Sequence, residues 1–352
     1  MDISKIDINL SVANGVLEED LEWFDIREEP FSIHGVFYDE KAGKYLRLPN
    51  EVSSSVSEFL ADLGTRTAGG RVRFITDSPY IAISAKIGSH GTMPHMCMAG
   101  QIGFDMYRDN IFCSVFMPPR DCGTEYVSGV TLSGGEHDYC INFPLYNGVK
   151  ELKIAIKKGA VLKAPTPYTH TKPIVYYGSS ITEGACASRP GTCYTATLAR
   201  RFDADHINLG FSGKAKGEQI IAEYIASLDM GIFVLDYDHN VKDAKQLEGT
   251  HKPFYDTVRR AHPDLPIVMI SAPDLPFHRA DFEPRREVVR QSYLAAVAEG
   301  DKNVYYIDGG RLIEGPDWDN CIVDTTHPND LGYFRMCEGI APTIKEIYDK
   351  QK

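Results

Sequence analysis

The fold is decided by residues 174–184, which read IVYYGSSITEG. The first four residues are aliphatic or aromatic, a pattern typical of a strand that is buried on both faces of a parallel sheet. The small residues that follow predict a tight turn into a helix, and such a turn can expose a hydroxyl group and aim backbone N–H groups near it. Ser180 in this turn is therefore a candidate nucleophile, although serine also serves routinely as a helix N-cap.

Downstream of this stretch, short apolar segments alternate with helical ones. The expected strands are residues 174–177, 206–209, 232–235, 267–270 and 304–307. The expected helices are residues 192–201, 216–228, 252–261 and 285–299. This alternation predicts an α/β fold with a flavodoxin-like parallel sheet flanked by helices, and such sheets carry their sites at the carboxyl ends of the strands.

Upstream, apolar and polar residues alternate with a period of two in short segments that are separated by turn residues. These segments are residues 31–37, 71–76, 80–85, 112–117, 126–132, 139–143 and 152–156. Such spacing predicts an all-β sandwich or jelly-roll domain. A proline-bearing connector, KAPTPYTH at residues 163–170, separates the two sequence patterns. We therefore expect a β domain over residues 1–165 and an α/β domain over residues 166–352.

The composition limits the classes of function. Of the 352 residues, 43% are hydrophobic and 24% are charged, and the net charge of −12 disfavours binding to nucleic acid or to an anionic membrane surface. No apolar run approaches the roughly 20 residues that a membrane helix needs. The N-terminus, MDISKIDINLSVANG, lacks a secretory pattern, which predicts a cytoplasmic location. The eight cysteines include no CxxC pair, so we expect reduced thiols rather than a disulfide scaffold or a zinc ribbon.

Three further segments place polar residues where the chemistry of such a sheet is expected. Residues 208–213 read NLGFSG and contain Gly213, whose backbone N–H can come close to a ligand. Residues 236–240 read DYDHN and contain Asn240, whose amide can donate to an oxyanion. Residues 324–328 read DTTHP, so the Asp324 carboxylate can orient the His327 ring within one turn. Each segment alone is also consistent with an ordinary turn or a surface salt bridge.

In this order, the four segments resemble the conserved blocks of the SGNH (GDSL-like) hydrolases over roughly residues 172–348. The resemblance implies a serine esterase with Ser180 as nucleophile, His327 as general base and Asp324 as the partner of the histidine. It also implies an oxyanion hole made by the N–H groups of Ser180 and Gly213 and by the Asn240 amide. No metal and no other cofactor is implied.

Two departures from the family pattern bear on these roles. Ser179 stands where the family usually has an aspartate, which affects how the nucleophile turn is braced. Residues 238–240 read DHN where the family usually has Gly-x-Asn-Asp, so His239 is an alternative oxyanion donor to Asn240.

The N-terminal half carries a resemblance of its own. Residues 103–107, GFDMY, resemble the Gly-x-Asp-Leu-Tyr motif of a β domain that accompanies one SGNH subgroup. A β-sandwich followed by an SGNH domain is also similar to carbohydrate esterases that deacetylate plant polysaccharides. These resemblances imply hydrolysis of short-chain esters, acetyl esters above all, on a small molecule or an oligosaccharide. The oligomeric state is left open.

Three other functions fit parts of the same pattern. A lysophospholipase or thioesterase could use the same triad beside an apolar groove for a long acyl chain. A metal-dependent hydrolase could use the ligand types offered by Asp236, Asp238, His239, Asp324 and His327. A glycan-binding protein without activity could retain the fold, although the intact serine, histidine and aspartate argue against it.

Overall fold

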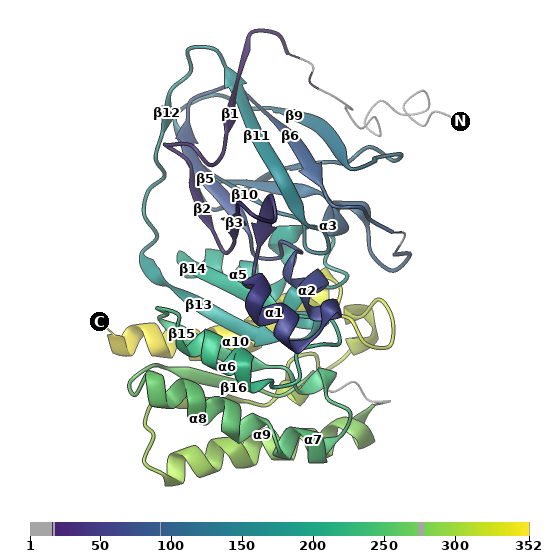
Figure 1. Ribbon diagram of the computed structural model, residues 1–352, viewed down its shortest axis with the longest axis vertical. Helices are drawn as coiled ribbons and strands as arrows, with labels where there is room; N and C mark the ends of the chain where they lie inside the picture. Colours follow the sequence, from purple (N-terminus) through teal and green to yellow (C-terminus); the bar gives the residue numbers. More distant parts are fainter. Residues whose placement is uncertain (1–15, 17, 92, 274–277, 352) are drawn as a thin grey trace.

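A five-stranded parallel sheet organises the C-terminal half of the chain. Figure 1 shows it in the computed structural model, which describes residues 16, 18–91, 93–273 and 278–351. The strands are β13 (His170–Gly178), β14 (Ala204–Gly210), β15 (Ile232–Asp236), β16 (Ile267–Ile270) and β17 (Val304–Ile307). Their spatial order is β14-β13-β15-β16-β17, and all four pairings are parallel. This is the flavodoxin-like order, with β13 at the point where the strand order reverses, so the predicted α/β sheet is confirmed.

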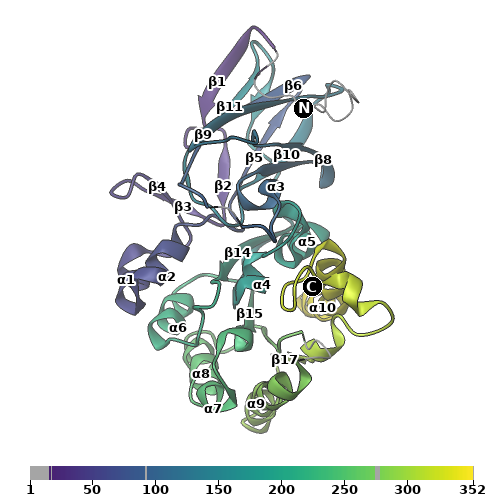
Figure 2. The ribbon, with the colours of Figure 1, turned by 90° about the vertical axis from the view of Figure 1, so that its right-hand side faces the viewer.

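Different helices cover the two faces of the sheet, because successive residues of β13 point to opposite sides. Ile174 and Tyr176 belong to one core together with residues of α5 and α10, whereas Val175 and Tyr177 belong to another core with residues of α6, α8 and α9. Figure 2 shows α6 and α8 on one side of the sheet and α5 and α10 on the other. The helices are α5 (Tyr194–Arg201), α6 (Gln219–Ala226), α7 (Ala244–Glu248), α8 (His251–Ala261), α9 (Arg279–Ala298) and α10 (Asp330–Gln351).

Two antiparallel sheets pack face to face in the N-terminal half, as the period-two pattern predicts. One sheet has the order β1-β11-β6-β9, and the other has the order β12-β5-β10-β7-β8, with β2 also paired to β5. The strands are β1 (Leu21–Asp25), β2 (Ser32–His34), β5 (Arg71–Thr76), β6 (Tyr80–Ile87), β7 (Phe104–Arg108), β8 (Ile111–Phe116), β9 (Glu125–Thr131), β10 (His137–Asn142), β11 (Val149–Lys157) and β12 (Leu162–Lys163). Side chains of both sheets, among them Phe74, Ile83 and Ile154, form a separate apolar core.

The N-terminal half also contains short helices, which alternation with a period of two does not predict. They are α1 (Asn50–Val56), α2 (Glu58–Gly64) and α3 (Met98–Gln101). The Ser57 side chain caps α2 by accepting a hydrogen bond from the Leu60 N–H at 3.1 Å. Leu60 and Leu63 of α2 are buried in the same core as Tyr177. This part of the N-terminal half therefore completes one face of the C-terminal sheet.

One predicted strand, residues 31–37, is divided in the structure. It forms β2, and then β3 (Phe37–Asp39) pairs with β4 (Lys44–Leu46) in a separate hairpin. Gly35 lies at the division with a φ of 73°, and a Cβ atom there would lie 2.2 Å from the carbonyl oxygen of Gly69. Glycine fits this backbone because it has no Cβ, so the chain turns there instead of continuing as one strand.

Two features bear on the expectations from composition. All eight cysteines lie in the described part of the chain as free thiols. Among the described residues, no helix has the length and apolar character needed to cross a bilayer. Residues 1–15, whose sequence underlies the predicted location, lie outside the described residues.

Candidate functional site

Ser180 is the first residue of a short helix, α4 (Ser180–Glu183), which follows β13 after a single residue. The side chain of that residue, Ser179, caps α4 by accepting a hydrogen bond from the Ile181 N–H at 3.1 Å. A serine therefore braces the turn at the position where the family usually has an aspartate. Gly184 ends the helix with a left-handed φ of 107°. The local sequence thus holds Ser180 at the carboxyl end of β13, beside the point where the strand order reverses.

Ser180, His327 and Asp324 form a continuous chain of hydrogen bonds. The distance from Ser180 Oγ to His327 Nε2 is 3.0 Å, and the distance from His327 Nδ1 to Asp324 Oδ2 is 2.9 Å. The other oxygen of Asp324 accepts hydrogen bonds from the backbone N–H groups of Thr326 and His327, each at 2.7 Å. Partial burial tends to raise the pKa of Asp324, but the hydrogen bonds from His327 and Thr326 outweigh it and keep this pKa below its usual value. An ionised Asp324 favours the tautomer in which His327 carries its proton on Nδ1 and leaves Nε2 free to accept.

The segment that carries His327 is shaped by its own backbone before it enters α10. The Val323 N–H donates to the carbonyl oxygen of His327 at 2.9 Å, and the Asn329 N–H donates to that of Cys321 at 2.9 Å. Ile322 and Pro328 pair as an isolated antiparallel bridge. These contacts form a narrow loop that presents the histidine ring to a serine 147 positions earlier in the chain.

Gly213 and Asn240, which the resemblance places in an oxyanion hole, are in direct contact. The Gly213 N–H donates to Asn240 Oδ1 at 3.2 Å, and Asn240 Nδ2 donates to the carbonyl oxygen of Phe211 at 2.9 Å. Gly213 has a left-handed φ of 66°, and apart from its two chain neighbours no described residue lies within 4 Å of where its Cβ would be. The loop after β14 and the segment after β15 therefore meet at the same edge of the sheet as Ser180.

His239, the alternative donor, lies in a different environment. Its ring stacks on Phe282 of α9 with 4.9 Å between ring centroids and 16° between ring planes. Its Nδ1 atom is buried and has no hydrogen-bond partner among the described residues. Burial, together with the positive charge of nearby side chains, lowers the pKa of His239 to about 3, so the ring is neutral. The geometry therefore favours Asn240 over His239 as the group beside Gly213.

The five residues considered for a metal-dependent hydrolase are not gathered into one site. Asp236 Oδ2 accepts hydrogen bonds from Tyr194 Oη at 2.8 Å and Thr182 Oγ1 at 3.1 Å, and Asp238 accepts from the Ala272 N–H at 2.9 Å. Burial raises the pKa of Asp236 to about 8 and that of Asp238 to about 6. These carboxyl groups therefore serve as internal hydrogen-bond acceptors. Among the described residues, a different group brings its metal-ligating atoms together, and it consists of His95, Cys186, Asp324 and His327.

Two side chains from the N-terminal half reach this site, and the sequence motifs do not identify them. Arg47 is buried against Glu183 of the nucleophile turn, and Glu183 Oε2 accepts the Ser212 N–H at 2.9 Å. The Tyr146 hydroxyl lies 2.7 Å from Ser212 Oγ and 3.4 Å from the Ser180 carbonyl oxygen. Neither residue belongs to a short motif, because each acts through a contact distant in sequence. Their partners Glu183 and Ser212 lie within the segment that the resemblance covers, whereas Arg47 and Tyr146 lie outside it.

Comparisons with known proteins agree with this architecture. Residues 171–345 match the GDSL-like lipase/acylhydrolase family, and residues 21–162 match the GxDLY family, which is the N-terminus of SGNH hydrolase-type esterases. A comparison with curated proteins found no match.

Solved structures with the same arrangement of both halves are also known. A candidate GDSL-like lipase from Bacteroides ovatus is 28% identical with a TM-score of 0.83, over 94% of this chain and 98% of that chain. The salicylyl-acyltransferase SsfX3 from a tetracycline biosynthetic pathway is 20% identical with a TM-score of 0.78, over 94% of this chain and 98% of that chain. A family two carbohydrate esterase from Clostridium thermocellum is 16% identical with a TM-score of 0.63, over 90% of this chain and 98% of that chain. At 20% and 16% identity, the last two similarities establish a shared fold and nothing more.

The two family matches lie on the two halves in which the structure places the β sheets and the parallel sheet. The chain therefore belongs to the SGNH-type, GDSL-like carboxylic ester hydrolases and carries the GxDLY domain at its N-terminal side.

Proposed function

We propose that this esterase hydrolyses short-chain esters, with acetyl groups on carbohydrates as preferred substrates, through a triad of Ser180, His327 and Asp324. The observation that carries the proposal is the chain of hydrogen bonds from Ser180 Oγ to His327 Nε2 at 3.0 Å and from His327 Nδ1 to Asp324 Oδ2 at 2.9 Å. Both distances are within the reach that proton transfer between a nucleophile and its base requires.

Each triad residue has a distinct part in the reaction. His327 Nε2 takes the Ser180 proton while Ser180 Oγ attacks the ester carbonyl carbon, and Asp324 stabilises the imidazolium that forms. The imidazolium then gives this proton to the leaving alcohol oxygen as the C–O bond breaks, which leaves an acyl group on Ser180. Water attacks the acyl-enzyme with His327 again as base, and the imidazolium returns the proton to Ser180 Oγ as the acyl–oxygen bond breaks and the carboxylic acid is released.

The oxyanion of the tetrahedral intermediate is bound by the N–H groups of Ser180 and Gly213 and by the Asn240 amide. The Ser180 N–H stands at the first position of α4, where a helix offers no internal acceptor. The Asn240 amide uses one of its hydrogens on Phe211, which leaves its second hydrogen for the oxyanion. The Gly213 N–H donates to Asn240 Oδ1 at rest and exchanges this partner for the oxyanion.

A polar pocket that is connected to the surroundings of Ser180 through Tyr146 supports a carbohydrate as the substrate. The pocket has a volume of about 330 Å³, and Tyr146, whose hydroxyl contacts Ser180 and Ser212, forms part of its wall. The other polar residues of the wall are Lys44, Asp62, Thr65, Arg66, Ser89, His90, Gln101, Asn147 and Lys150, and Met93 and three glycines complete it. A long acyl chain requires an apolar groove, whereas a hydrated sugar is bound through polar side chains of this kind.

Acyl-chain profiling and acetate release test the proposal together. We expect nitrophenyl acetate to be cleaved faster than esters of longer acids, and acetylated oligosaccharides to release acetate that mass spectrometry detects. Ser180→Ala should abolish both activities, whereas Ser54→Ala, at an exposed serine on α1, should retain them. Near-native activity of Ser180→Ala would rule out the triad, and a preference for long chains would favour a lipid or thioester hydrolase.

Covalent labelling separates an active esterase from a protein that only binds glycans. A fluorophosphonate reacts with a serine that a neighbouring base activates. We expect it to label the wild type but not Ser180→Ala. Binding of sugar without labelling of the wild type would favour the glycan-binding alternative.

A further inference from the structure

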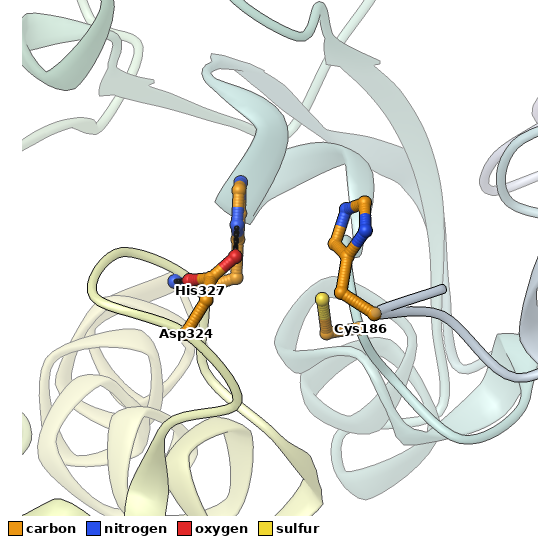
Figure 3. Close-up of side chains that lie close together, drawn as sticks. Cys186, Asp324 and His327 are labelled. Carbon is orange, nitrogen blue, oxygen red and sulfur yellow. Dashed lines mark hydrogen bonds and ion pairs between the residues drawn. The ribbon is translucent and has the colours of Figure 1, made fainter. Parts of the chain in front are cut away.

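Two side chains with no part in the proposed reaction lie against the triad. They are His95, in the connection between β6 and α3, and Cys186, just after α4. One metal-ligating atom from each of His95, Cys186, Asp324 and His327 lies within 4.8 Å of the other three. Figure 3 shows Cys186 pointing toward the space beside Asp324 and His327.

Both additional side chains are available to bind a ligand. His95 is exposed, and its ring lies 6.0 Å from the His327 ring, measured between centroids. Cys186 is a buried free thiol. Among the described residues, neither His95 nor Cys186 has a hydrogen-bond partner for its side chain. Their donor atoms are therefore not occupied by the fold itself.

We propose that His95, Cys186, Asp324 and His327 form a binding site for a divalent transition-metal ion of the Zn²⁺ type, and that this ion reversibly inhibits the esterase. Two imidazoles, a thiolate and a carboxylate are the donor types that zinc takes, and four is its usual coordination number. The charges also match, because one carboxylate and one thiolate neutralise the two positive charges of the ion.

A tetrahedral zinc site at this place requires only a local movement of the four side chains. Zinc–ligand bonds of about 2.0–2.3 Å place the ligand atoms of a tetrahedral site roughly 3.3–3.8 Å apart. The four side chains therefore have to close by about an ångström from their separations in the empty site. His95 can supply most of this movement through its side-chain rotamer, because it is exposed and forms no hydrogen bond in the described part of the chain.

Binding replaces the proton of the Cys186 thiol. As the sulfur–metal bond forms, this proton passes to solvent, and the sulfur binds as a thiolate.

Inhibition follows from the hydrogen bonds of His327. If the ion binds Nε2, it takes the atom that accepts the Ser180 proton. If it binds Nδ1, it displaces the bond to Asp324 that orients the ring. Either mode removes the general base. This consequence rests on the triad of the proposed function, whereas binding of the ion does not.

The test titrates the purified full chain with Zn²⁺ and follows hydrolysis of nitrophenyl acetate. We expect His95→Ala and Cys186→Ser each to raise the half-inhibiting Zn²⁺ concentration by at least tenfold. The control is His137→Ala, which removes a histidine that pairs with Asp109 on the β domain, and it should leave this concentration within twofold of the wild type. His95→Ala is not expected to affect folding, because the side chain is exposed.

Co²⁺ provides a readout that does not depend on activity. A thiolate ligand gives bound Co²⁺ a charge-transfer band in the near ultraviolet, so we expect this band in the wild type and not in Cys186→Ser. The proposal is overturned by a shift of less than tenfold in His95→Ala, or by the absence of the band in the wild type. If Ser180→Ala retains activity while the band is present, the proposed triad fails but the metal site stands.

Discussion

Arg47 and Glu183 form an ion pair in which both side chains are fully buried, with Arg47 Nη2 lying 3.3 Å from Glu183 Oε1. Arg47 follows β4 in the N-terminal half, and Glu183 is the last residue of α4 in the nucleophile turn. The guanidinium also donates to the carbonyl oxygens of Leu63, Arg66, Asn208 and Gly210. Through Glu183, this one pair links the N-terminal half to the Ser212 N–H of the oxyanion loop.

Replacing Arg47 should destabilise the protein and slow the reaction. Arg47→Met leaves Glu183 with Arg66 at 3.5 Å as its remaining cation. Breaking a buried pair from one side costs about 3–5 kcal/mol, so we expect the free energy of unfolding in urea to fall by about that amount. We also expect kcat to fall more than KM rises, because Glu183 then holds Ser212 less firmly.

An exposed ion pair of the same chain provides the control for Arg47→Met. Lys157 Nζ lies 2.6 Å from Glu18 Oε2, with both side chains partly open to solvent. Such pairs contribute at most about 1 kcal/mol, so Lys157→Met should change the free energy of unfolding by no more than that. Equal losses in the two variants would show that the Arg47–Glu183 pair has no special importance for stability.

Asp324→Asn should lower kcat by about 10³–10⁴ with little change in KM, because the amide no longer selects the His327 tautomer that accepts from Ser180. Nitrophenyl acetate kinetics provide the measurement. Asp319→Asn, in the 3-10 helix Trp318–Cys321, is the matched control and should retain nearly full activity. A loss of less than tenfold in Asp324→Asn would remove Asp324 from the triad.

The parallel sheet was predictable because its strands are buried on both faces and therefore read as continuous apolar runs. The predicted ranges for β16 and β17 coincide with the observed strands, and β13 extends beyond its predicted range at both ends. Ser180, Asp324 and His327 could be proposed from the sequence because each lies in a short local motif. The structure adds their mutual distances, which depend on how the loop before α10 folds back.

The remaining contributions to the site come from contacts that are distant in sequence. Arg47 meets Glu183 across 136 positions, and its neighbours in sequence give no sign of a buried ion pair. Helices α1 and α2 contain serines and charged residues, so their apolar face, with Leu60 and Leu63, becomes evident only where it meets the core beneath Tyr177. His95 and Cys186 likewise come within 4.8 Å of each other only because the two halves of the chain pack together.

The two candidate oxyanion donors can be separated by substitution. Asn240→Ala should lower kcat by about 10²–10³, the usual effect of removing one donor. His239→Ala should retain kcat within about tenfold, since it loses a stacking contact with Phe282 rather than a hydrogen bond to the transition state. The same nitrophenyl acetate assay measures both variants. The reverse pattern would assign the role to His239.

Stability should depend on pH through Asp236, whose pKa burial raises to about 8 in the folded protein. The ordinary pKa of an unfolded aspartate is about 3.9, so between these values the folded state binds one more proton than the unfolded state. The contribution of this group is therefore present at low pH and is lost as pH rises toward 8.

Asp236→Asn tests this dependence, because it keeps an oxygen that accepts from Tyr194 and Thr182 but cannot titrate. Between pH 5 and 7, the free energy of unfolding of the wild type should fall relative to Asp236→Asn by about 1.4 kcal/mol per pH unit, and near pH 8 by about half of that, as measured in urea. The difference in unfolding free energy between the two proteins cancels the titration of the histidines, which is common to both. Parallel pH profiles of the two proteins would show that Asp236 is ionised in the folded protein at pH 6.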